Sequence, residues 1–198
     1  MTQVDVAAEA ADPSGADAST RAKILDVALA LFTEQGFDGT SMREIAARLR
    51  ISKPAIYYHF ASKDDILLAL HMRLHQFVRP AFERLTGQAV TLEIWGSVLD
   101  DLTGQMLAHR TIFLMHERNQ AAMDKLHRTD HAVEHDDISE RLRRALADPA
   151  LPLRDRVRMA CSLGAVFGPL FMAGGAFDGV DGAQLGSLVR DAVRDVVG

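Results

Sequence analysis

The sequence is poor in cysteine and carries no basic residue near its start. Its one cysteine, Cys161, cannot form a bridge within the chain, which excludes a disulfide-stapled secreted domain. No lysine or arginine precedes Arg21 and no apolar run opens the chain, so we expect neither a signal peptide nor a transit peptide. These absences predict a cytoplasmic protein.

Long apolar runs are scarce as well. Residues 159–177 carry no charge and reach the length of a membrane span, but four glycines, Pro169 and Ser162 dilute their apolarity. We therefore expect no membrane span and interpret the segment as a helix in a protein interface. The 198 residues, 48% hydrophobic and 25% charged, have the composition of a soluble globular chain that can bury a core without disulfides or metal.

The net charge of −5 is unevenly distributed along the chain. Residues 1–18 hold four acids and no base, whereas residues 19–63 hold seven bases against four acids. This local excess is compatible with nucleic-acid binding, because attraction to phosphates acts within a Debye length. An ordinary solvated surface would give the same excess.

Helical periodicity begins at Ser19. Residues 1–18 have no periodic apolar face and are predicted to form a disordered tail. Apolar residues then recur at helical spacing up to Gly36, which suits the end of a first helix. No alternating strand pattern follows, so the predicted fold class is all-α, with about nine helices.

Three serines predict the starts of the next helices. Ser41 and Ser62 are each followed three positions later by an acid, which is the capping-box pattern, and Ser52 precedes Pro54, which is tolerated in a first turn. Ile45, Ile56 and Phe60 would face inward, together with Leu49, and Pro80 would bend or end the fourth helix. Two short capped helices joined by a few residues are typical of a helix-turn-helix.

The residues of this region carry a family resemblance. Residues 40–46 (TSMREIA), 51–60 (ISKPAIYYHF) and 62–67 (SKDDIL) resemble the N-terminal DNA-binding domain of TetR/AcrR-family transcriptional regulators. The resemblance implies a three-helix helix-turn-helix DNA-binding domain over residues 19–64 and a helical ligand-binding and dimerisation domain over residues 65–198. Arg50 stands where the family usually has glycine, so we expect it to take the left-handed conformation at a cost of about 1 kcal/mol.

Eight residues are predicted to meet DNA. The serines lie at helix starts, where phosphates are held, the long cations can reach guanine edges or phosphates, and the aromatic residues occupy the exposed turn of the recognition helix. Lys63 matches a family lysine that usually contacts the DNA backbone. The serines are equally explained as caps, and the aromatic residues could instead form a buried cluster. The predicted DNA-binding residues are Ser41, Arg43, Ser52, Lys53, Tyr57, Tyr58, His59 and Lys63.

The end of the chain suggests a homodimer. Ala160, Gly164 and Gly168 form a stripe of small residues at four-residue spacing, which would let another helix approach closely, and an apolar helix follows. In the family the last two long helices form the dimer interface, although such a stripe also serves a monomer core. The predicted interface residues are Ala160, Gly164, Gly168, Leu185, Val189 and Val193.

Methionines and aromatic residues with a few polar groups lie between these two regions. Such side chains line adaptable apolar pockets, and the family places an inducer pocket here, but each residue could equally be ordinary core. The predicted ligand-binding residues are Met72, His75, Trp95, Leu99, Met106, Phe113, His116, Asn119, Phe167 and Phe171.

The histidines raise a metal alternative. His71 and His75 form one i, i+4 pair, and His127, His131 and His135 form a longer ladder in a very polar segment. No cysteine or clear fourth ligand accompanies either group, and no catalytic motif is present, so we expect no metal, no cofactor and no enzymatic activity. A helical metal-binding protein or enzyme using these histidines remains the alternative to the regulator.

The resemblance predicts a repressor that binds a palindromic operator in double-stranded DNA as a homodimer. A small apolar or amphipathic effector would release it, while a regulator without an inducer, or an activator, stays open.

Overall fold

The described part of the chain forms ten helices and no strand. The computed structural model describes residues 13–87, 89–127, 132–169, 176–177 and 179–198. The all-helical prediction is confirmed, with one helix more than the nine expected. The helices are α1 (Pro13–Glu34), α2 (Met42–Leu49), α3 (Lys53–His59), α4 (Lys63–Glu83), α5 (Leu92–Ala108), α6 (Arg110–Arg118), α7 (Gln120–His127), α8 (Ala132–Ala147), α9 (Leu153–Phe167) and α10 (Gly182–Val197).

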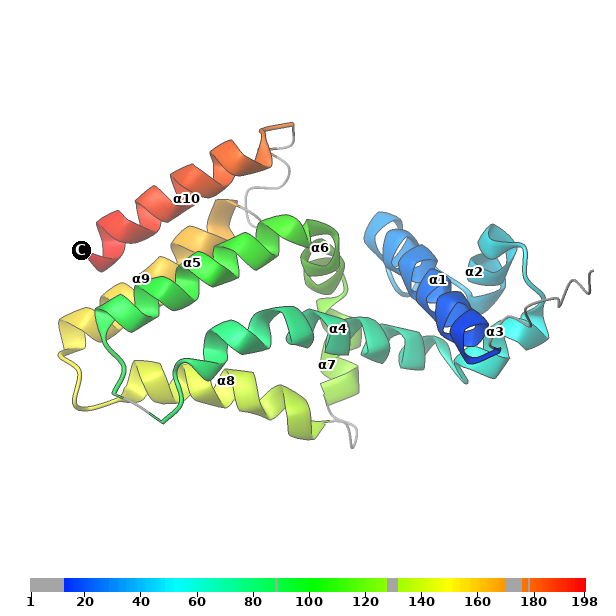
Figure 1. Ribbon diagram of the computed structural model, residues 1–198, viewed down its shortest axis with the longest axis horizontal. Helices are drawn as coiled ribbons and strands as arrows, with labels where there is room; N and C mark the ends of the chain where they lie inside the picture. The colour runs from blue at the N-terminus through cyan, green and yellow to red at the C-terminus, as the bar shows by residue number, and fades with distance from the viewer. Residues whose placement is uncertain (1–12, 88, 128–131, 170–175, 178) are drawn as a thin grey trace, which may run out of the picture.

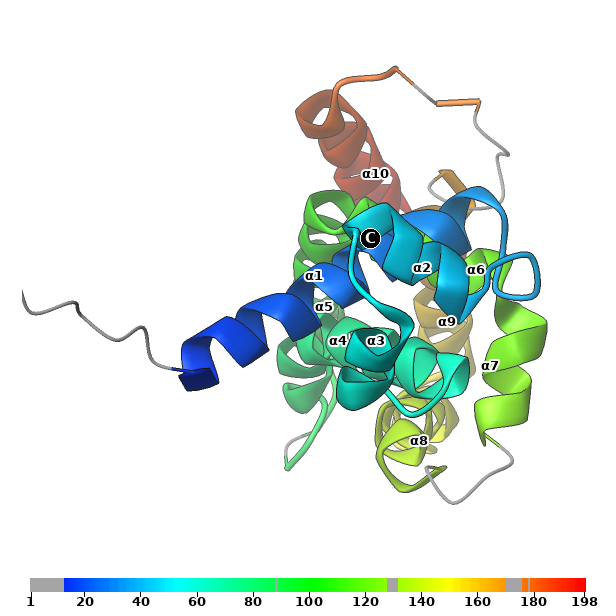
Figure 2. The ribbon, with the colours of Figure 1, turned by 90° about the vertical axis from the view of Figure 1, so that its right-hand side faces the viewer.

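The molecule is elongated, with a head at one end and a body at the other. Figure 1 shows α1, α2 and α3 as the head, α4 running from the head into the body, and the C-terminus at the far end of the body. Helices α5 to α10 form the body, where α10 packs on α9 and α5, and α4 packs on α5 and α8. Figure 2 views the molecule from the head and shows α8 and α10 on opposite sides of the body.

The predicted tail was too long. Helix α1 begins at Pro13, because proline is well suited to a first turn and alanine favours the helix that follows. Residues 13–18 are therefore helical, and residues 1–12 lie outside the described part.

The serine caps form as predicted, with one difference. Ser52 Oγ accepts from Ala55 N–H at 3.3 Å, and Ser62 forms the full capping box with Asp65. Ser41 Oγ accepts from Glu44 N–H at 3.2 Å, but the Glu44 carboxylate accepts from Gln35 Nε2 instead of closing a box.

The fourth helix does not end at Pro80. It continues to Glu83, and Pro80 lies within its last turn.

One hydrophobic core runs through the head and the body. Ile45, Ile56 and Phe60 are buried in the head as predicted, while Leu49 is half-buried. In the body the indole of Trp95 on α5 is fully buried and donates to Ser162 Oγ on α9 at 2.9 Å. None of the described helices is long and apolar enough to cross a membrane.

Candidate nucleic-acid interface

The turn between α2 and α3 depends on Arg50. Its φ of 56° and ψ of 35° are left-handed, as predicted, and the turn is closed by hydrogen bonds from Arg50 N–H to Ala47 O and from Ile51 N–H to Ala46 O. Arg48 and Arg50 are both exposed beside the turn. Neither was among the predicted DNA-binding residues, although the basic excess of residues 19–63 was a signal for them.

Helix α3 presents a cation and two tyrosines to solvent. Tyr57 is 43% exposed, Tyr58 is 78% exposed, and Lys53 Nζ lies 5.7 Å from the centre of the Tyr57 ring. The opposite side of α3 buries Ile56 in the head, so this short helix has one fixed face and one free face. The aromatic residues therefore do not form a buried cluster. Hydroxyls, ring faces and an ammonium on one helix can contact phosphates, base edges and thymine methyl groups.

His59 is placed differently from the two tyrosines. Its side chain is only 8% exposed, and its Nδ1 lies 3.3 Å from Asp17 Oδ1 on α1. His59 therefore fixes α3 against α1 and does not belong to the exposed face. Sequence reasoning missed this contact because Asp17 was assigned to the disordered tail.

Lys63 is also engaged within the head. Its Nζ donates to Phe37 O at 2.5 Å and to Thr40 O at 2.8 Å, and it lies over the Phe37 ring. Two of the three ammonium donors are thus used inside the protein. Lys63 primarily holds the start of α4 against the loop before α2, which differs from the predicted backbone contact to DNA.

The remaining predicted head residues lie near the surface. Ser41, Arg43 and Ser52 are exposed, and Ser62 is half-buried. The three serine hydroxyls serve as helix caps, so any contact they make with DNA would come in addition to this role.

The predicted ligand residues in the body divide into two groups. Trp95, Leu99 and Met106 are fully buried, and Phe113 and His75 are nearly so, which agrees with an apolar interior. The ring of His71 lies 4.3 Å from that of His75 and 5.3 Å from that of His116, so these imidazoles gather between α4 and α6.

Four of the predicted ligand residues do not join this interior. Asn119 is buried, but its amide hydrogen-bonds to the head. Phe167 is 37% exposed and Met72 lies in a groove between α1 and α4, because helical spacing does not fix which face a neighbouring helix covers. Phe171 lies outside the described residues.

Cavities occur within the body and where α1 of the head meets α4. One of about 320 Å³ lies between α5 and α10 beside Leu99, Asp100 and Arg190. A second of about 420 Å³ separates α1 from α4 beside Arg21 and Met72. A third of about 200 Å³ lies where α1, α4 and the α5–α6 turn meet. Of the predicted ligand residues, Leu99 lines the first of these cavities and Met72 lines the second, whereas none lines the third.

Helix α9 leaves an apolar stripe uncovered in the single chain. Leu153 is 68% exposed and Val157 is 52% exposed, and Ala160 and Gly164 continue the same face. A Cβ added at Gly164 or at Gly168 would meet nothing within 4 Å. The stripe is longer than predicted, and its i, i+4, i+7 spacing from Leu153 was the signal.

The predicted interface residues of α10 face the interior of the chain. Leu185, Val189 and Val193 are buried within the chain, where α10 packs on α9 and α5. The sequence prediction placed these residues in the dimer interface. The apolar periodicity of α10 shows that one face is covered, but it does not show whether the same chain or a second copy covers that face. The exposed apolar residue of α10 is Leu188, at 58%.

The metal alternative gains no support from the described residues. Among them, no group of three or more His, Cys, Asp or Glu side chains is arranged to hold a metal ion. The side chains of His127, His131 and His135 lie outside the described part.

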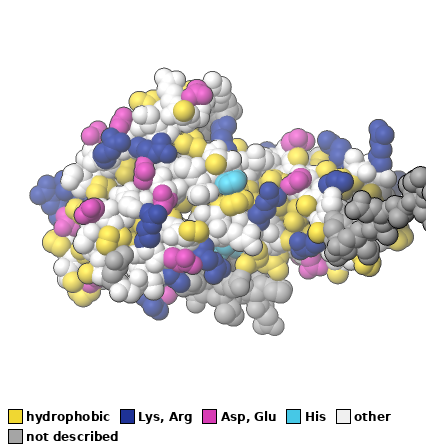
Figure 3. Space-filling model, viewed as in Figure 1, with side chains coloured by type: hydrophobic (Ala, Val, Ile, Leu, Met, Phe, Trp, Pro, Cys, Tyr) yellow, Lys and Arg dark blue, Asp and Glu magenta, His cyan; other side chains and the backbone are white. Residues whose placement is uncertain are grey.

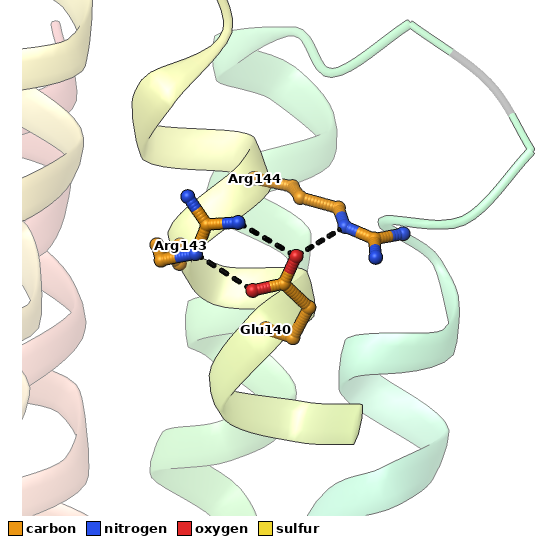
Figure 4. Close-up of polar contacts among 3 residues, drawn as sticks. All are labelled: Glu140, Arg143 and Arg144. Atoms are coloured by element: carbon orange, nitrogen blue, oxygen red, sulfur yellow. Dashed lines mark hydrogen bonds and ion pairs between the residues drawn. The ribbon is translucent and has the colours of Figure 1, made fainter. Parts of the chain in front are cut away.

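Several charges on the body are paired at the surface. Figure 3 shows acidic and basic side chains interspersed on the face of Figure 1. In Figure 4 the Glu140 carboxylate on α8 accepts from Arg143 at 2.6 and 2.7 Å and from Arg144 at 2.7 Å. The hydrogen bonds from Arg143 and Arg144 lower the pKa of Glu140 from 4.5 to about 2. This trio is exposed and stabilises α8 locally.

Comparisons with known proteins agree with this geometry. Residues 24–70 match the profile of the tetR family of bacterial regulatory proteins. Over 44 residues the chain is 50% identical to the Staphylococcus aureus IcaR, a negative transcriptional regulator of the biofilm operon icaADBC, and over 47 residues it is 51% identical to the Shigella flexneri transcriptional regulator AcrR. These matches cover 22% and 24% of this chain and 24% and 22% of the relatives, so the similarity spans about a quarter of their length.

Solved structures extend the likeness to the whole fold. A TetR/AcrR-family transcriptional regulator from Aquifex aeolicus superposes with a TM-score of 0.63 at 20% identity, covering 89% of this chain and 99% of that one. The structure of a SmeT–triclosan complex superposes with a TM-score of 0.63 at 22% identity, covering 89% and 90%.

Proposed function

We propose that the chain is a sequence-specific DNA-binding transcriptional regulator, because residues 24–70 match the profile of the tetR family of bacterial regulatory proteins. The observation that carries the proposal is the free face of α3, where Lys53, Tyr57 and Tyr58 stand exposed beside the left-handed turn at Arg50. A helix of this kind enters the major groove and reads base edges, while neighbouring cations contact phosphates. The enzyme or metal-binding alternative is not favoured.

The regulator acts as a homodimer in this proposal. The stripe of Leu153, Val157, Ala160 and Gly164 on α9 is apolar and exposed in one copy, and the space beside Gly164 is open to a second helix. Two-fold symmetry would then place two α3 helices on a palindromic operator with half-sites about 34–36 Å apart.

In this proposal the protein is a cytoplasmic repressor that uses no cofactor. A small apolar or amphipathic effector releases it from its operator. IcaR is a negative regulator and the SmeT structure contains triclosan, which supports this reading by similarity. In this chain, α4 connects the head to the buried methionines, aromatic rings and imidazoles of the body. An effector that favours one head arrangement would shift the equilibrium by its differential affinity, typically about 1–3 kcal/mol.

The DNA proposal is tested by selecting genomic fragments on the purified protein and measuring affinity for the enriched sequence. We expect an enriched palindrome whose binding weakens steeply with salt, because phosphate contacts release counterions. Equal affinity for the selected sequence and for a scrambled one would contradict sequence-specific regulation.

The effector proposal is tested with Trp95, the only tryptophan of the chain. Candidate apolar molecules are titrated while its fluorescence is followed, with and without saturating operator. Because linkage is reciprocal, a releasing effector must bind more weakly to the operator complex by the same factor by which it weakens DNA binding. Binding of equal strength in both states would rule out release by that molecule.

A further inference from the structure

A single buried amide in the body is hydrogen-bonded to the head. Asn119 lies at the junction of α6 and α7 and is 5% exposed. Its Oδ1 accepts from Phe37 N–H at 2.6 Å, and its Nδ2 donates to Phe32 O at 3.0 Å and to Met115 O at 2.6 Å. One side chain therefore joins the end of α6 to the end of α1 and to the loop that follows it.

The loop that Asn119 contacts, residues 35–40, leads directly into α2. It turns at Gly36, whose φ is +83°, and Thr40 Oγ1 donates back to Gly36 O at 2.8 Å. Gln35 Nε2 reaches from the loop to Glu44 on α2 at 2.9 Å. The loop is thus closed on itself and attached to the helix-turn-helix.

The same loop is held from a second direction. Lys63, the first residue of α4, donates to Phe37 O, while Asn119 accepts from Phe37 N–H. The N–H and the C=O of one residue are therefore held by side chains from α4 and from the α6–α7 junction. Helix α1 also packs along α6, so this contact continues a wider surface.

We propose that Asn119 is a positioning residue through which the body sets the orientation of the DNA-binding head. This inference rests on the proposed function. Helix α4 and the packing of α1 along α6 connect the head to the body, and the hydrogen bonds of Asn119 add a directional attachment at Phe37 that fixes the rotation of the head. A shift of the α6–α7 junction would move the 35–40 loop and, through it, α2 and α3.

The effect on operator affinity follows from the fraction of heads that are in the binding-competent orientation. A head that visits the competent orientation only part of the time binds with an affinity reduced by that fraction, and a dimer needs both heads at once. If release of the Asn119 contact leaves each head in the competent orientation about a tenth of the time, operator affinity falls about tenfold per head and about a hundredfold for a dimer.

The test compares three variants of the full chain. Asn119→Ala removes the three hydrogen bonds, and Asn119→Leu removes them while nearly keeping the volume of the side chain. Gln120→Ala changes the exposed neighbour and serves as the control. Amide hydrogen exchange is measured over residues 35–50 and over α5 and α9, and affinity is measured for the operator that the parent selects.

We expect both Asn119 variants to exchange faster than the parent over residues 35–50, to exchange at parental rates in α5 and α9, and to lose operator affinity. Gln120→Ala should match the parent throughout. If Asn119→Leu keeps parental exchange and affinity, Asn119 acts by filling space and the proposal is wrong. Faster loop exchange with unchanged operator affinity would also overturn it.

Two further outcomes are distinguishable. Loss of the Trp95 emission of the folded body in both variants would show that Asn119 maintains the whole fold, which contradicts a positioning role. If the parent binds no DNA with sequence preference, the proposed function fails, while the exchange measurements still decide whether Asn119 holds the head.

Discussion

The head and the body differ in where the side chains that would meet a partner come from. In the head, Lys53, Tyr57 and Tyr58 lie within one short helix, and their exposure follows from the burial of Ile56 on its other face. In the body, the predicted ligand-binding residues come from several different helices. A site carried by one element is fixed by local geometry, whereas a site shared by many depends on how the helices pack.

Aromatic residues offer the strongest contrast between the two regions. Trp95 in the body is fully buried and hydrogen-bonded to Ser162, whereas Tyr58 in the head is 78% exposed. Trp95→Ala should lower the free energy of unfolding by about 3–5 kcal/mol, since it leaves a large cavity and removes the buried hydrogen bond to Ser162 Oγ. Tyr58→Ala should change it by less than about 0.5 kcal/mol.

The free energy of unfolding of both variants is measured by urea denaturation followed by circular dichroism. Tryptophan fluorescence is unsuitable because Trp95→Ala removes the only tryptophan of the chain. Equal destabilisation by the two substitutions would contradict the division into a packed body and a solvent-facing head helix.

The next effect concerns the exposed face of the body. A Cβ added at Gly164 meets nothing within 4 Å and the residue is exposed, so Gly164→Leu should fold normally. Between two copies the same side chain would overpack the contact and cost about 1–3 kcal/mol of association free energy. Sedimentation should show a dimer for the parent and dissociation for the variant.

Gly96→Leu is the matched control, since a Cβ added at Gly96 also meets nothing within 4 Å, but the residue lies on α5 beside a cavity. It should stay dimeric. A parent that sediments as a monomer at micromolar concentration would remove α9 as the dimer surface.

The two regions also differ in how far the sequence could predict them. The caps at Ser41, Ser52 and Ser62, the left-handed Arg50 and the buried Ile56 are local features, and the structure confirms them. Local patterns determine helix starts because caps, turns and periodicity act over three to seven residues.

The errors about side-chain contacts concern segments that are distant in the sequence. Asn119 meets Phe37 across 82 positions, and His59 meets Asp17, which sequence reasoning placed in a tail. Leu185, Val189 and Val193 were correctly identified as apolar, but they face α5 and α9 of the same chain. Periodicity shows that a helix face is covered and does not show by what, so the pocket and the interface of the body could not be resolved.

Within the head, the exposed face of α3 predicts a loss of binding without a loss of stability. Tyr57→Ala and Lys53→Ala should each weaken operator binding by about 1–3 kcal/mol where a base is read, and Lys53→Ala should reduce the salt slope by about one if it contacts phosphate. Affinities measured over a range of salt concentrations separate these outcomes.

Lys125→Ala provides the control for charge, because Lys125 is an exposed lysine on α7 in the body. It should leave operator affinity unchanged. A folded Tyr57→Ala variant that binds as tightly as the parent would remove Tyr57 from the interface.

The smallest effect is expected from the exposed charges of the body, at Glu140. Its folded-state pKa is lowered from 4.5 to about 2 by hydrogen bonds from Arg143 and Arg144, so its contribution to stability is present above pH 4.5 and is lost as the pH falls through about 2. Glu140→Gln should therefore lower the Tm slightly at pH 7 and approach the parent as the pH nears 2, where the parental carboxyl becomes neutral too. Because the trio is exposed, added salt should narrow the difference at pH 7. Melting curves of the two proteins at several pH values measure this, and a gap that stays constant between pH 7 and pH 2 would show that Glu140 acts by packing and not by its charge.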